Sequence, residues 1–583
     1  MCGIAGVLHP TDAPLLVASL LHRLRHRGPD GELVVSGEGC ALGVRRLAVR
    51  GAASDRNPII EASRIVALNG EIYRFPQTGP VRGRVPTNPL EEVRAILASE
   101  AAGVRPEGMY AIAEFEGALG ELRLQRDQFG MKPLFWRVHG DTLLFASETK
   151  ALRMQTAPEA VDCSAIDDIL AFGRPLGSRT PYRGIRPVPR GKSVVFFKRG
   201  EVISPAMTRP LLPAPSYPGG LRQAVRESLL ACLQTNRAVG LAISGGIDST
   251  ILAWELNDLG VEALTTFSVH VEGAADGVRD LGNLGLPANG PWRRWRHVNV
   301  PVRADQLFEL TNESVQAMDT PHRMTSAPLC IALARAVAKD EISVLLTGEG
   351  PDELFFGYES HRRFFQGITS RPRSRQTARL ADLTNFALQG TGRHMLNLVL
   401  PNRRSEACVE RFARRYRALA HGSPAAALGE VELDLSLEPL LARTDQCLMK
   451  YGIEGRMPFL HDAVPALAAS VSERAAGQTV SKQQFREAWA DCLPPQLLFK
   501  KKVAFRSPLR DWVAKGDGGW LRAYLVDARD ELAKIGLNVD PLVTRAESTQ
   551  KHVLMSFALC TTAMWLRSMS QQSASQLNHP TAS

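Results

Sequence analysis

The sequence predicts a protein of mixed α/β and α+β class with more than one domain, on three observations. Its 583 residues are enough for two to four domains. The uncharged apolar run 238–243 leads through a glycine turn into a helical pattern, which is typical of a parallel α/β sheet. The Pro/Gly-rich segment 210–220 interrupts both periodic patterns and indicates a linker. We therefore predict domains at 1–209 and 221–569, and a disordered polar tail at 570–583.

The composition is that of a soluble globular protein, with 44% hydrophobic and 22% charged residues. No apolar run approaches the length of a membrane span. The nine cysteines include no C-x-x-C pair, so the sequence favours a reduced, cytoplasmic setting without a zinc site or a disulfide framework. The net charge of +10 raises nucleic-acid binding as a hypothesis. Arginine-rich segments such as 371–375 lack regular aromatic interleaving, which favours a solvated basic surface instead.

The chain begins with a cysteine at position two. Removal of the initiator methionine would leave Cys2 with a thiol and a free α-amino group. An α-amine has a pKa of about 8, so it can act as the general base for its own thiol. Cys2 is therefore a candidate N-terminal nucleophile.

Segments after the N-terminus strengthen this hypothesis. Arg46 places a cation on a predicted strand, and Asn69-Gly70 offers a side-chain amide and a backbone N–H, the donors of an oxyanion hole. Taken alone, Asn69-Gly70 is also a hairpin signal. The motif-like segments 26–31, 126–134 and 145–152 complete the pattern.

In this order the segments resemble the class II (N-terminal nucleophile) glutamine amidotransferase domain over residues 1–200. The resemblance implies an Ntn-type αββα sandwich. It makes Cys2 the nucleophile on the glutamine carboxamide, with Asn69 and Gly70 holding the oxyanion. It also implies that Arg46 pairs with the glutamine α-carboxylate and that Glu71 helps to hold the substrate.

One position departs from that family. The aspartate that binds the glutamine α-ammonium group in the family is Leu90 here. Loss of a charged partner costs about 1.5–3 kcal/mol of binding. Two outcomes follow from this change, namely weak glutamine binding or replacement of the carboxylate by Glu91 or Glu92.

The second half is organised around residues 244–250, SGGIDST, between an apolar strand and a helix. This geometry aims backbone N–H groups at an anion, and the hydroxyls add further donors. Asp248 suits such a loop only if a cation accompanies the anion, as magnesium accompanies a nucleotide phosphate. The lysine of the G-x-x-x-x-G-K-[ST] loop is missing.

Three further segments carry charge. Residues 347–353 follow an apolar strand and hold several carboxylates, which repel one another unless a cation or a base role holds them. Residues 445–460 contain GIEGRMPFL, and residues 500–508 contain a lysine cluster before Phe505.

Together these segments resemble the ATP pyrophosphatases, and residues 220–565 resemble the synthetase domain of the asparagine synthetase B family. The resemblance implies a doubly wound parallel α/β domain with added helices. It implies magnesium bound by Asp248 and Asp352, Glu349 contacting the acyl-adenylate and accepting a proton, and Lys502 neutralising the departing pyrophosphate. The residues implied to bind ATP are Ile243, Ser244, Gly245, Gly246, Asp248, Ser249, Val269, Thr347 and Gly348.

The resemblance implies ATP-dependent amidation of a carboxylate through an acyl-AMP, with aspartate favoured and ammonia released from glutamine at Cys2. ATP and Mg²⁺ are the expected cofactors, and the resemblance also allows a homodimer. Leu90 and the unassigned stretch 272–296 leave open a lasso-peptide cyclase, a β-lactam synthetase or amidation of a secondary-metabolite carboxylate. A tRNA-modifying ATP pyrophosphatase is the rival of a different class, and the sequence shows neither its nucleic-acid-binding domain nor its cysteine pair.

Overall fold

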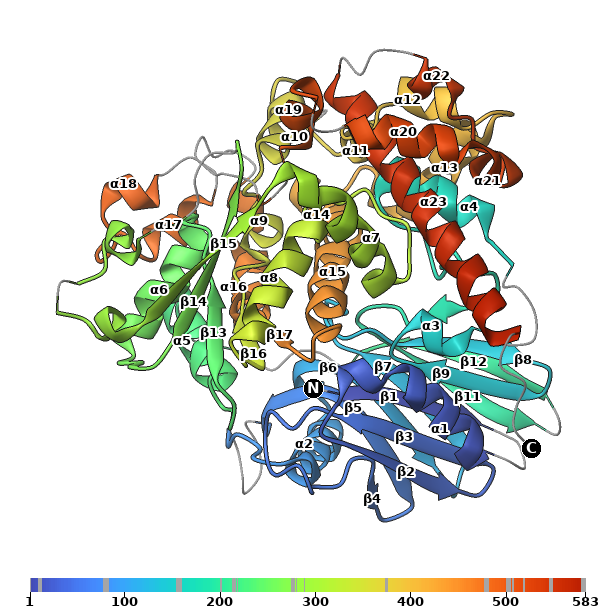
Figure 1. The fold of residues 1–583 in the computed structure, drawn as a ribbon. Coiled ribbons are helices and arrows are strands. Elements are labelled where there is room, and N and C mark those ends of the chain that lie inside the picture. Colours follow the sequence, from blue (N-terminus) through green and yellow to red (C-terminus); the bar gives the residue numbers. More distant parts are fainter. Residues whose placement is uncertain are drawn as a thin grey trace.

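A computed structural model gives the fold (Figure 1). The structure describes the whole chain except residues 1, 9–12, 77–82, 154–159, 200–201, 212–216, 218, 274–277, 279, 288, 373–375, 476–481, 500–504, 506–507, 517–518, 545–548 and 578–583. Lys502 and most of the predicted linker lie outside the described residues.

The N-terminal half forms two six-stranded antiparallel sheets. The first has the order β10 (Arg186–Pro187), β8 (Phe135–His139), β9 (Thr142–Ala146), β1 (Cys2–Leu8), β3 (Cys40–Arg46) and β2 (Gly31–Gly37). The second has the order β12 (Val202–Pro210), β11 (Lys192–Arg199), β7 (Glu121–Arg126), β6 (Glu107–Glu116), β5 (Arg64–Arg74) and β4 (Ile59–Glu61).

The two sheets pack face to face around one apolar layer, to which Ile4 of β1 and Phe115 of β6 contribute. Helix α1 (Ala13–Arg23) packs on β1 and β3 of the first sheet, and α2 (Pro89–Ala101) packs on β5 of the second. Strand residues alternate between the two faces of a sheet, so each sheet can bury both its faces. This layering confirms the predicted αββα sandwich (Figure 1, blue to cyan).

The C-terminal half is built on a parallel sheet with the order β15 (Arg296–Val302), β14 (Thr265–Val271), β13 (Val239–Ala242), β16 (Val344–Leu346) and β17 (Glu454–Arg456). On one face, Leu346 packs in a core with α5 (Leu221–Cys232) and α6 (Ile247–Asp258). On the other face, the adjacent Leu345 packs in a core with α8 (Ala327–Lys339). Helices on both faces confirm the doubly wound class.

The sheet order reverses at β13, because the chain moves outward from it first through β14 and β15 and later through β16 and β17. In open parallel sheets, ligands bind beyond the carboxyl ends of the strands at such a switch point. The loops after β13 and β16 lie at this position.

Further helices surround both halves, and two of them lie between β9 and β10 in the chain. They are α3 (Thr149–Leu152), α4 (Cys163–Phe172), α7 (Leu307–Met318), α9 (Pro351–Leu354), α10 (Glu359–Thr369), α11 (Leu380–Ala387), α12 (Arg393–Val399), α13 (Arg404–Tyr416), α14 (Pro424–Glu432), α15 (Glu438–Met449), α16 (Ala463–Ala475), α17 (Gln483–Glu487), α18 (Pro495–Leu498), α19 (Leu509–Ala514), α20 (Gly519–Asp527), α21 (Arg529–Lys534), α22 (Asp540–Val543) and α23 (Gln550–Leu577).

Helix α23 overlaps the predicted polar tail. We expected disorder from residue 570, but the helix runs on to Leu577. No glycine or proline interrupts the chain between Gln550 and Leu577, so nothing local ends the helix earlier. Residues 578–583 lie outside the described residues.

The stretch 272–296, which had no assignment, connects β14 to β15 through two short 3₁₀ turns, η2 (Leu281–Leu284) and η3 (Pro291–Arg294). It packs against the end of α6, where Asn257 accepts a hydrogen bond from the Trp292 backbone N–H. Across the described residues, no helix has both the length and the apolar character needed to span a bilayer.

Candidate functional site

Cys2 lies at the start of β1, directly opposite Arg46 in the pairing of β1 with β3. Side chains of directly opposed residues project from the same face of a sheet. The Cys2 backbone N–H donates to Asn69 Oδ1 at 3.2 Å. The structure therefore brings together three of the predicted amidotransferase residues, Cys2, Arg46 and Asn69.

Asn69 presents a donor that nothing in the described protein satisfies. The residue is fully buried, and its Nδ2 has no hydrogen-bond partner among the described residues. A buried N–H without a partner is costly and rare, and it commonly marks a functional position. Because Asn69 Oδ1 accepts from the Cys2 backbone N–H, this amide lies next to Cys2 and has an N–H that can donate to an oxyanion.

Gly70 lies in the middle of β5, opposite Tyr110, and not in a hairpin turn. Its φ is +127°, and a Cβ atom would lie 2.0 Å from the Met109 carbonyl oxygen. Only glycine fits this position.

Arg46 is buried, and its Nη2 donates to the carbonyl oxygens of Arg50 at 3.1 Å and Ala52 at 2.7 Å. Its Nε has no partner among the described residues. A buried guanidinium with donor capacity to spare suits a carboxylate ligand.

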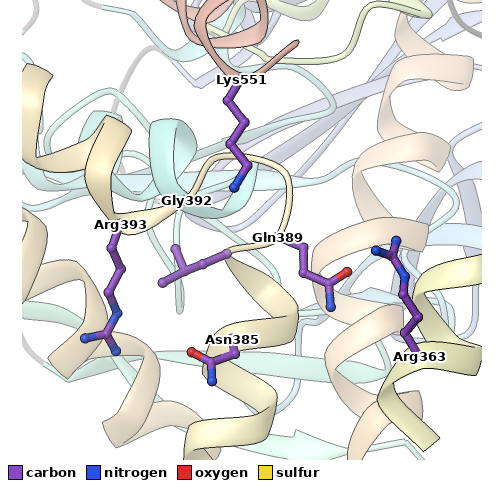
Figure 2. Close-up of a pocket in the computed structure, with 7 residues that line it drawn as sticks. Arg363, Asn385, Gln389, Gly392, Arg393 and Lys551 are labelled. Carbon is purple, nitrogen blue, oxygen red and sulfur yellow. The ribbon is translucent and has the colours of Figure 1, made fainter. Parts of the chain in front are cut away.

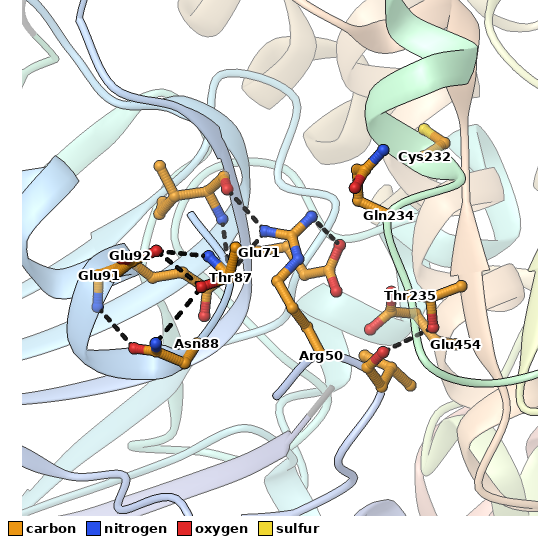
Figure 3. A network of polar contacts seen from close by, with 12 residues as sticks. Arg50, Glu71, Thr87, Asn88, Glu91, Glu92, Cys232, Gln234, Thr235 and Glu454 are labelled. Carbon is orange, nitrogen blue, oxygen red and sulfur yellow. Dashed lines mark hydrogen bonds and ion pairs between the residues drawn. The ribbon is translucent and has the colours of Figure 1, made fainter. Parts of the chain in front are cut away.

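Glu71 is held by two arginines from different domains. Its carboxylate accepts from Arg50 at 3.3 Å and from Arg456 of β17 at 2.5 Å. Figure 3 shows Arg50 between Glu71 and Glu92. The Glu71 carboxylate is thus committed to this fork, which leaves its backbone as the part that can hold a substrate.

Glu91 and Glu92, the acids next to Leu90, both have other partners within the protein. Glu91 caps its own helix by accepting from the Thr87 backbone N–H and hydroxyl, both at 2.8 Å (Figure 3). Glu92 is buried and accepts from the Ile72 backbone N–H and from Arg50, both at 3.2 Å. Burial, reinforced by the charge of Glu71 and opposed by Arg50, raises the pKa of Glu92 to about 7.

The second site begins at the loop between β13 and α6. Gly245 adopts a left-handed φ of +72°, and Gly246 precedes the first turn of α6. Ser249 fixes the loop, because its hydroxyl accepts from the Ser244 backbone N–H at 3.1 Å and donates to the Gly246 carbonyl oxygen at 3.2 Å. This is the predicted anion-binding loop at a helix N-terminus.

The loop after β16 packs directly on it. A Cβ atom on Gly348 would lie 3.3 Å from the Ser249 backbone nitrogen and 3.4 Å from Asp248 Cβ. The two loops flank a cavity of about 320 Å³. Its lining includes Ile243, Ser244, Asp248, Ser249, Val269, Thr347, Gly348, Glu349 and Asp352, and omits the predicted Gly245 and Gly246.

Asp248 and Asp352 converge on one cation. Lys482 is buried, and its Nζ lies 2.7 Å and 2.8 Å from the two carboxylate oxygens of Asp248 and 2.8 Å from Asp352 Oδ1. Mg²⁺ beside a nucleotide is commonly held by one or two carboxylates together with phosphate oxygens. These two carboxylates already share a cation, so the residues fit the predicted metal.

Glu349 is fixed at the wall of the same cavity. Its Oε1 accepts from the Thr444 hydroxyl at 2.6 Å and from the guanidinium of Arg443, a buried residue of α15. Glu353, also buried there, accepts from the Tyr358 hydroxyl at 2.5 Å. Burial, with a contribution from the charge of Glu432, raises the pKa of Glu353 to about 8, so that its carboxyl is mainly protonated at neutral pH.

Comparison with known protein families shows which family has these two sites. The sequence profile described as Asparagine synthase matches residues 220–567, and the Glutamine amidotransferase domain profile matches residues 1–206. The chain belongs to the asparagine synthase family. It is therefore a ligase that forms carbon–nitrogen bonds and carries a glutamine amidotransferase domain.

Individual relatives cover most of the chain. Asparagine synthetase [glutamine-hydrolyzing] 1 of Bacillus subtilis is 23% identical over 91% of each chain. A Mycobacterium tuberculosis protein, described provisionally as a glutamine-hydrolysing asparagine synthetase, is 27% identical over 89% of each chain. Asparagine synthetase [glutamine-hydrolyzing] 2 of Oryza sativa is 27% identical over 61% of this chain and 60% of its own.

In this asparagine synthase-family chain, the remaining sequence motifs meet at the junction of the two halves. Arg27 pairs with Glu148 at 2.8 Å and with Asp445 of α15 at 2.9 Å. Lys132 lies 3.5 Å from the same Asp445. All four side chains are nearly or fully buried. The four motifs at 26–31, 126–134, 145–152 and 445–460 thus each contribute one charged residue to a cluster of ion pairs between the two halves.

Lys482, Arg50, Arg456 and Asn57 are the site residues that the sequence did not indicate. Asn57 Nδ2 lies 3.9 Å from the Cys2 sulfur and donates to the Leu68 carbonyl oxygen. Lys482 follows an unremarkable polar stretch, and no local pattern connects it with Asp248. Arg456 stood within a recognised motif, but its partner in the other domain could not be inferred from spacing.

Proposed function

We propose that this member of the asparagine synthase family converts aspartate into asparagine, using ATP and ammonia released from glutamine. The observation that carries the proposal is the meeting of Asp248 and Asp352 at Lys482, in a cavity whose wall holds Glu349. Such an arrangement suits a nucleoside triphosphate beside a group that can accept a proton.

At the first site, Cys2 attacks the glutamine carboxamide and forms a glutamyl thioester, with ammonia leaving. Asn69 Nδ2 and the Gly70 N–H stabilise the oxyanion, and Arg46 binds the α-carboxylate. Water then releases glutamate from Cys2. The unpaired amide of Asn69 next to the Cys2 backbone supports these roles.

At the second site, the loops around Ser244 and Gly348 hold ATP, and the substrate carboxylate attacks its α-phosphate to give an acyl-AMP and pyrophosphate. Mg²⁺, held by Asp248 and Asp352, would supply positive charge to the phosphates. Glu349 accepts a proton from the ammonia that displaces AMP. Lys482 neutralises the departing pyrophosphate. Lys502 has the same role, which is proposed from its position in the sequence before Phe505, a residue that lines the cavity.

Pyrophosphate release tests the proposal. The purified chain is given ATP, Mg²⁺ and ammonia with aspartate or with other carboxylates, and amide formation is followed by mass spectrometry. Aspartate-dependent release with formation of asparagine is expected. Release only with another carboxylate would assign a different acyl substrate, and release with none would reject the amidation chemistry.

The Cys2→Ala variant separates the two sites. Glutamine-driven turnover is expected to fall to background, because no thioester can form, while ammonia-driven turnover stays near that of the wild type. Loss of ammonia-driven turnover in a folded Cys2→Ala protein would contradict the two-site mechanism. We also propose a cytoplasmic location and a homodimer, to be checked by cell fractionation and light scattering.

A further inference from the structure

Glutamine is a zwitterion, and its binding site has to satisfy both an α-carboxylate and an α-ammonium group. Arg46 supplies a buried cation for the first. Leu90 offers no charge for the second, and Glu91 and Glu92 are engaged in helix capping and in the contact with Arg50. The anionic half of the site has to come from elsewhere in the chain.

Asp55 lies where that charge is missing. It lines a cavity of about 410 Å³ together with Asn88 and Leu90. Its Oδ2 lies 3.8 Å from Arg46 Nη2 and accepts from the Ala52 backbone N–H at 2.7 Å. No partner within the described part of the chain is recorded for its Oδ1, and the side chain is 33% exposed.

Gly51 lies against both the Asp55 carboxylate and the start of α2. A Cβ atom on Gly51 would lie 2.3 Å from Asp55 Oδ2 and 3.3 Å from Asn88 Cβ. The absence of a side chain at position 51 therefore lets the Asp55 loop and the start of α2 approach each other. Asp55 belongs to the loop between β3 and β4, where the sequence contains no motif that predicts a binding residue.

We propose that Asp55 binds the α-ammonium group of glutamine in place of the carboxylate absent at position 90. The loose pair of Arg46 and Asp55 opens when the substrate enters. The α-carboxylate then pairs with Arg46 and the α-ammonium group with Asp55, so each charge keeps an opposite partner. This inference rests on the proposed glutaminase reaction at Cys2.

The test compares glutamine with glutaramate, which has the same carboxamide but no α-amine. In Asp55→Asn the amide oxygen can still accept from the Ala52 N–H, so the turn is kept and only the charge is lost. We expect the KM for glutamine to rise about tenfold or more, with a smaller change in kcat. The KM for glutaramate should stay unchanged.

Glu61→Gln is the matched control, since it removes an acid at the end of β4 that pairs with Arg94 at 3.2 Å. Leu90→Asp should restore glutamine binding to Asp55→Asn. An unchanged KM for glutamine, or an equal rise for both substrates, would overturn the assignment. A wild-type protein that hydrolyses neither substrate would instead reject the reaction at Cys2.

A second cavity, separate from both sites, carries an independent inference. It measures about 450 Å³ and is lined by Arg363, Asn385, Leu388, Gln389, Gly392, Arg393 and Lys551. Figure 2 shows these side chains arranged around it, contributed by α10, α11, α12, α23 and the connection between α11 and α12. Among the residues that the structure describes, its lining has three cations, two carboxamides and no acid.

Lys551 reaches into this cavity because Gly392 has no side chain. A Cβ atom on Gly392, whose φ is +78°, would lie 3.0 Å from Lys551 Nζ. Like charges that converge without an acid repel one another, and a ligand with several negative charges removes that repulsion. We infer that this cavity binds a small polyanion, either phosphorylated or polycarboxylate.

Thermal unfolding of the full chain at low ionic strength, with tripolyphosphate or with citrate, tests this site. Either probe should raise the Tm of the wild type, and the one giving the larger rise identifies the class of anion. The rise should be lost in Arg363→Ala/Lys551→Ala and kept in Arg414→Ala/Lys534→Ala, which removes two exposed cations elsewhere. No rise with either probe, or an equal rise in all three proteins, would overturn the inference.

Discussion

At the residue scale, the proposed glutaminase site depends on a polar atom that the described fold leaves without a partner. Asn69 Nδ2 is buried beside Cys2, and its companion Oδ1 is fixed by the Cys2 backbone N–H. The protein therefore carries the desolvation cost of this amide before any substrate arrives. A developing oxyanion would recover that cost.

Replacement of Asn69 by alanine tests this interpretation. Loss of one oxyanion donor is expected to lower kcat for glutamine hydrolysis by about 10²–10³-fold, with ammonia-driven synthesis as the internal control. Steady-state kinetics with each nitrogen source measures both. A loss in glutamine hydrolysis of less than about threefold would remove Asn69 from the oxyanion hole.

Glu353 makes stability depend on pH. Its carboxyl has a pKa of about 8 in the folded protein, against 4.5 when unperturbed, so between these values the folded state holds a proton that the unfolded state releases. The free energy of unfolding should therefore fall as pH rises through this window. Glu353→Gln keeps the neutral form at every pH and should remove this contribution.

Urea unfolding of both proteins, at several pH values from 5 upward to about 9, measures the difference. The Glu353→Gln protein should become progressively more stable relative to the wild type as pH rises. Parallel pH curves for the two proteins would show that Glu353 has an ordinary pKa.

At the element scale, two loops at the switch point of the parallel sheet form the proposed ATP site, where a glycine lets them touch. Gly348 brings the loop after β16 within van der Waals reach of the first turn of α6. That contact aligns Asp248 with Asp352, which Lys482 then bridges. The alignment of the carboxylates is thus a consequence of backbone packing.

Gly348→Ala should disturb this alignment. Its new Cβ would be tighter against Ser249 N than ordinary packing allows, so one loop has to shift by a few tenths of an ångström. We expect the KM for ATP to rise by about tenfold, while glutamine hydrolysis at Cys2 is unchanged. Gly367→Ala, where a Cβ meets nothing within 4 Å, is the control. Equal ATP kinetics in both variants would contradict the packing argument.

The sequence was informative about these elements where local pattern sufficed. The apolar runs before Ser244 and before Thr347 correctly placed two strands and the loops that follow them. Lys482 could not be placed, because it meets Asp248 across 234 residues of chain. Asp55 was missed for a similar reason, since its relation to Arg46 and Leu90 exists only once β3, β4 and α2 have packed.

At the scale of the whole molecule, the two halves are joined by buried charges. Arg456 is fully buried and bonds Glu71, Glu454 and the Cys232 carbonyl oxygen, each at 2.5 Å. The αββα architecture was predicted from the family resemblance and not from periodicity. The ion pairs between the halves became visible only in the tertiary structure. Motifs such as 26–31 and 445–460 were recognised as markers, but their meeting through Arg27 and Asp445 was not predicted.

Arg456→Met should destabilise the protein strongly, because two carboxylates would remain buried without their shared cation. The expected loss is about 3–5 kcal/mol in the free energy of unfolding. Adding Glu71→Gln should recover part of it, since only Glu454 then lacks Arg456 as a charged partner; in the single variant Glu71 keeps Arg50. Chemical denaturation of the single and double variants measures this, and a loss below about 1 kcal/mol in Arg456→Met would show that the fork contributes little.

The Glu71 fork also limits how such enzymes can be recombined. Consider a chimera with the amidotransferase half of this chain and the synthetase half of another protein. Such a chimera contains the buried carboxylate of Glu71, next to Gly70. Unless the incoming strand supplies an arginine at the position of Arg456, that carboxylate loses its partner in the other half. The two halves are therefore exchangeable only as a matched set, because this salt bridge and the Arg27–Asp445 pair both cross the seam.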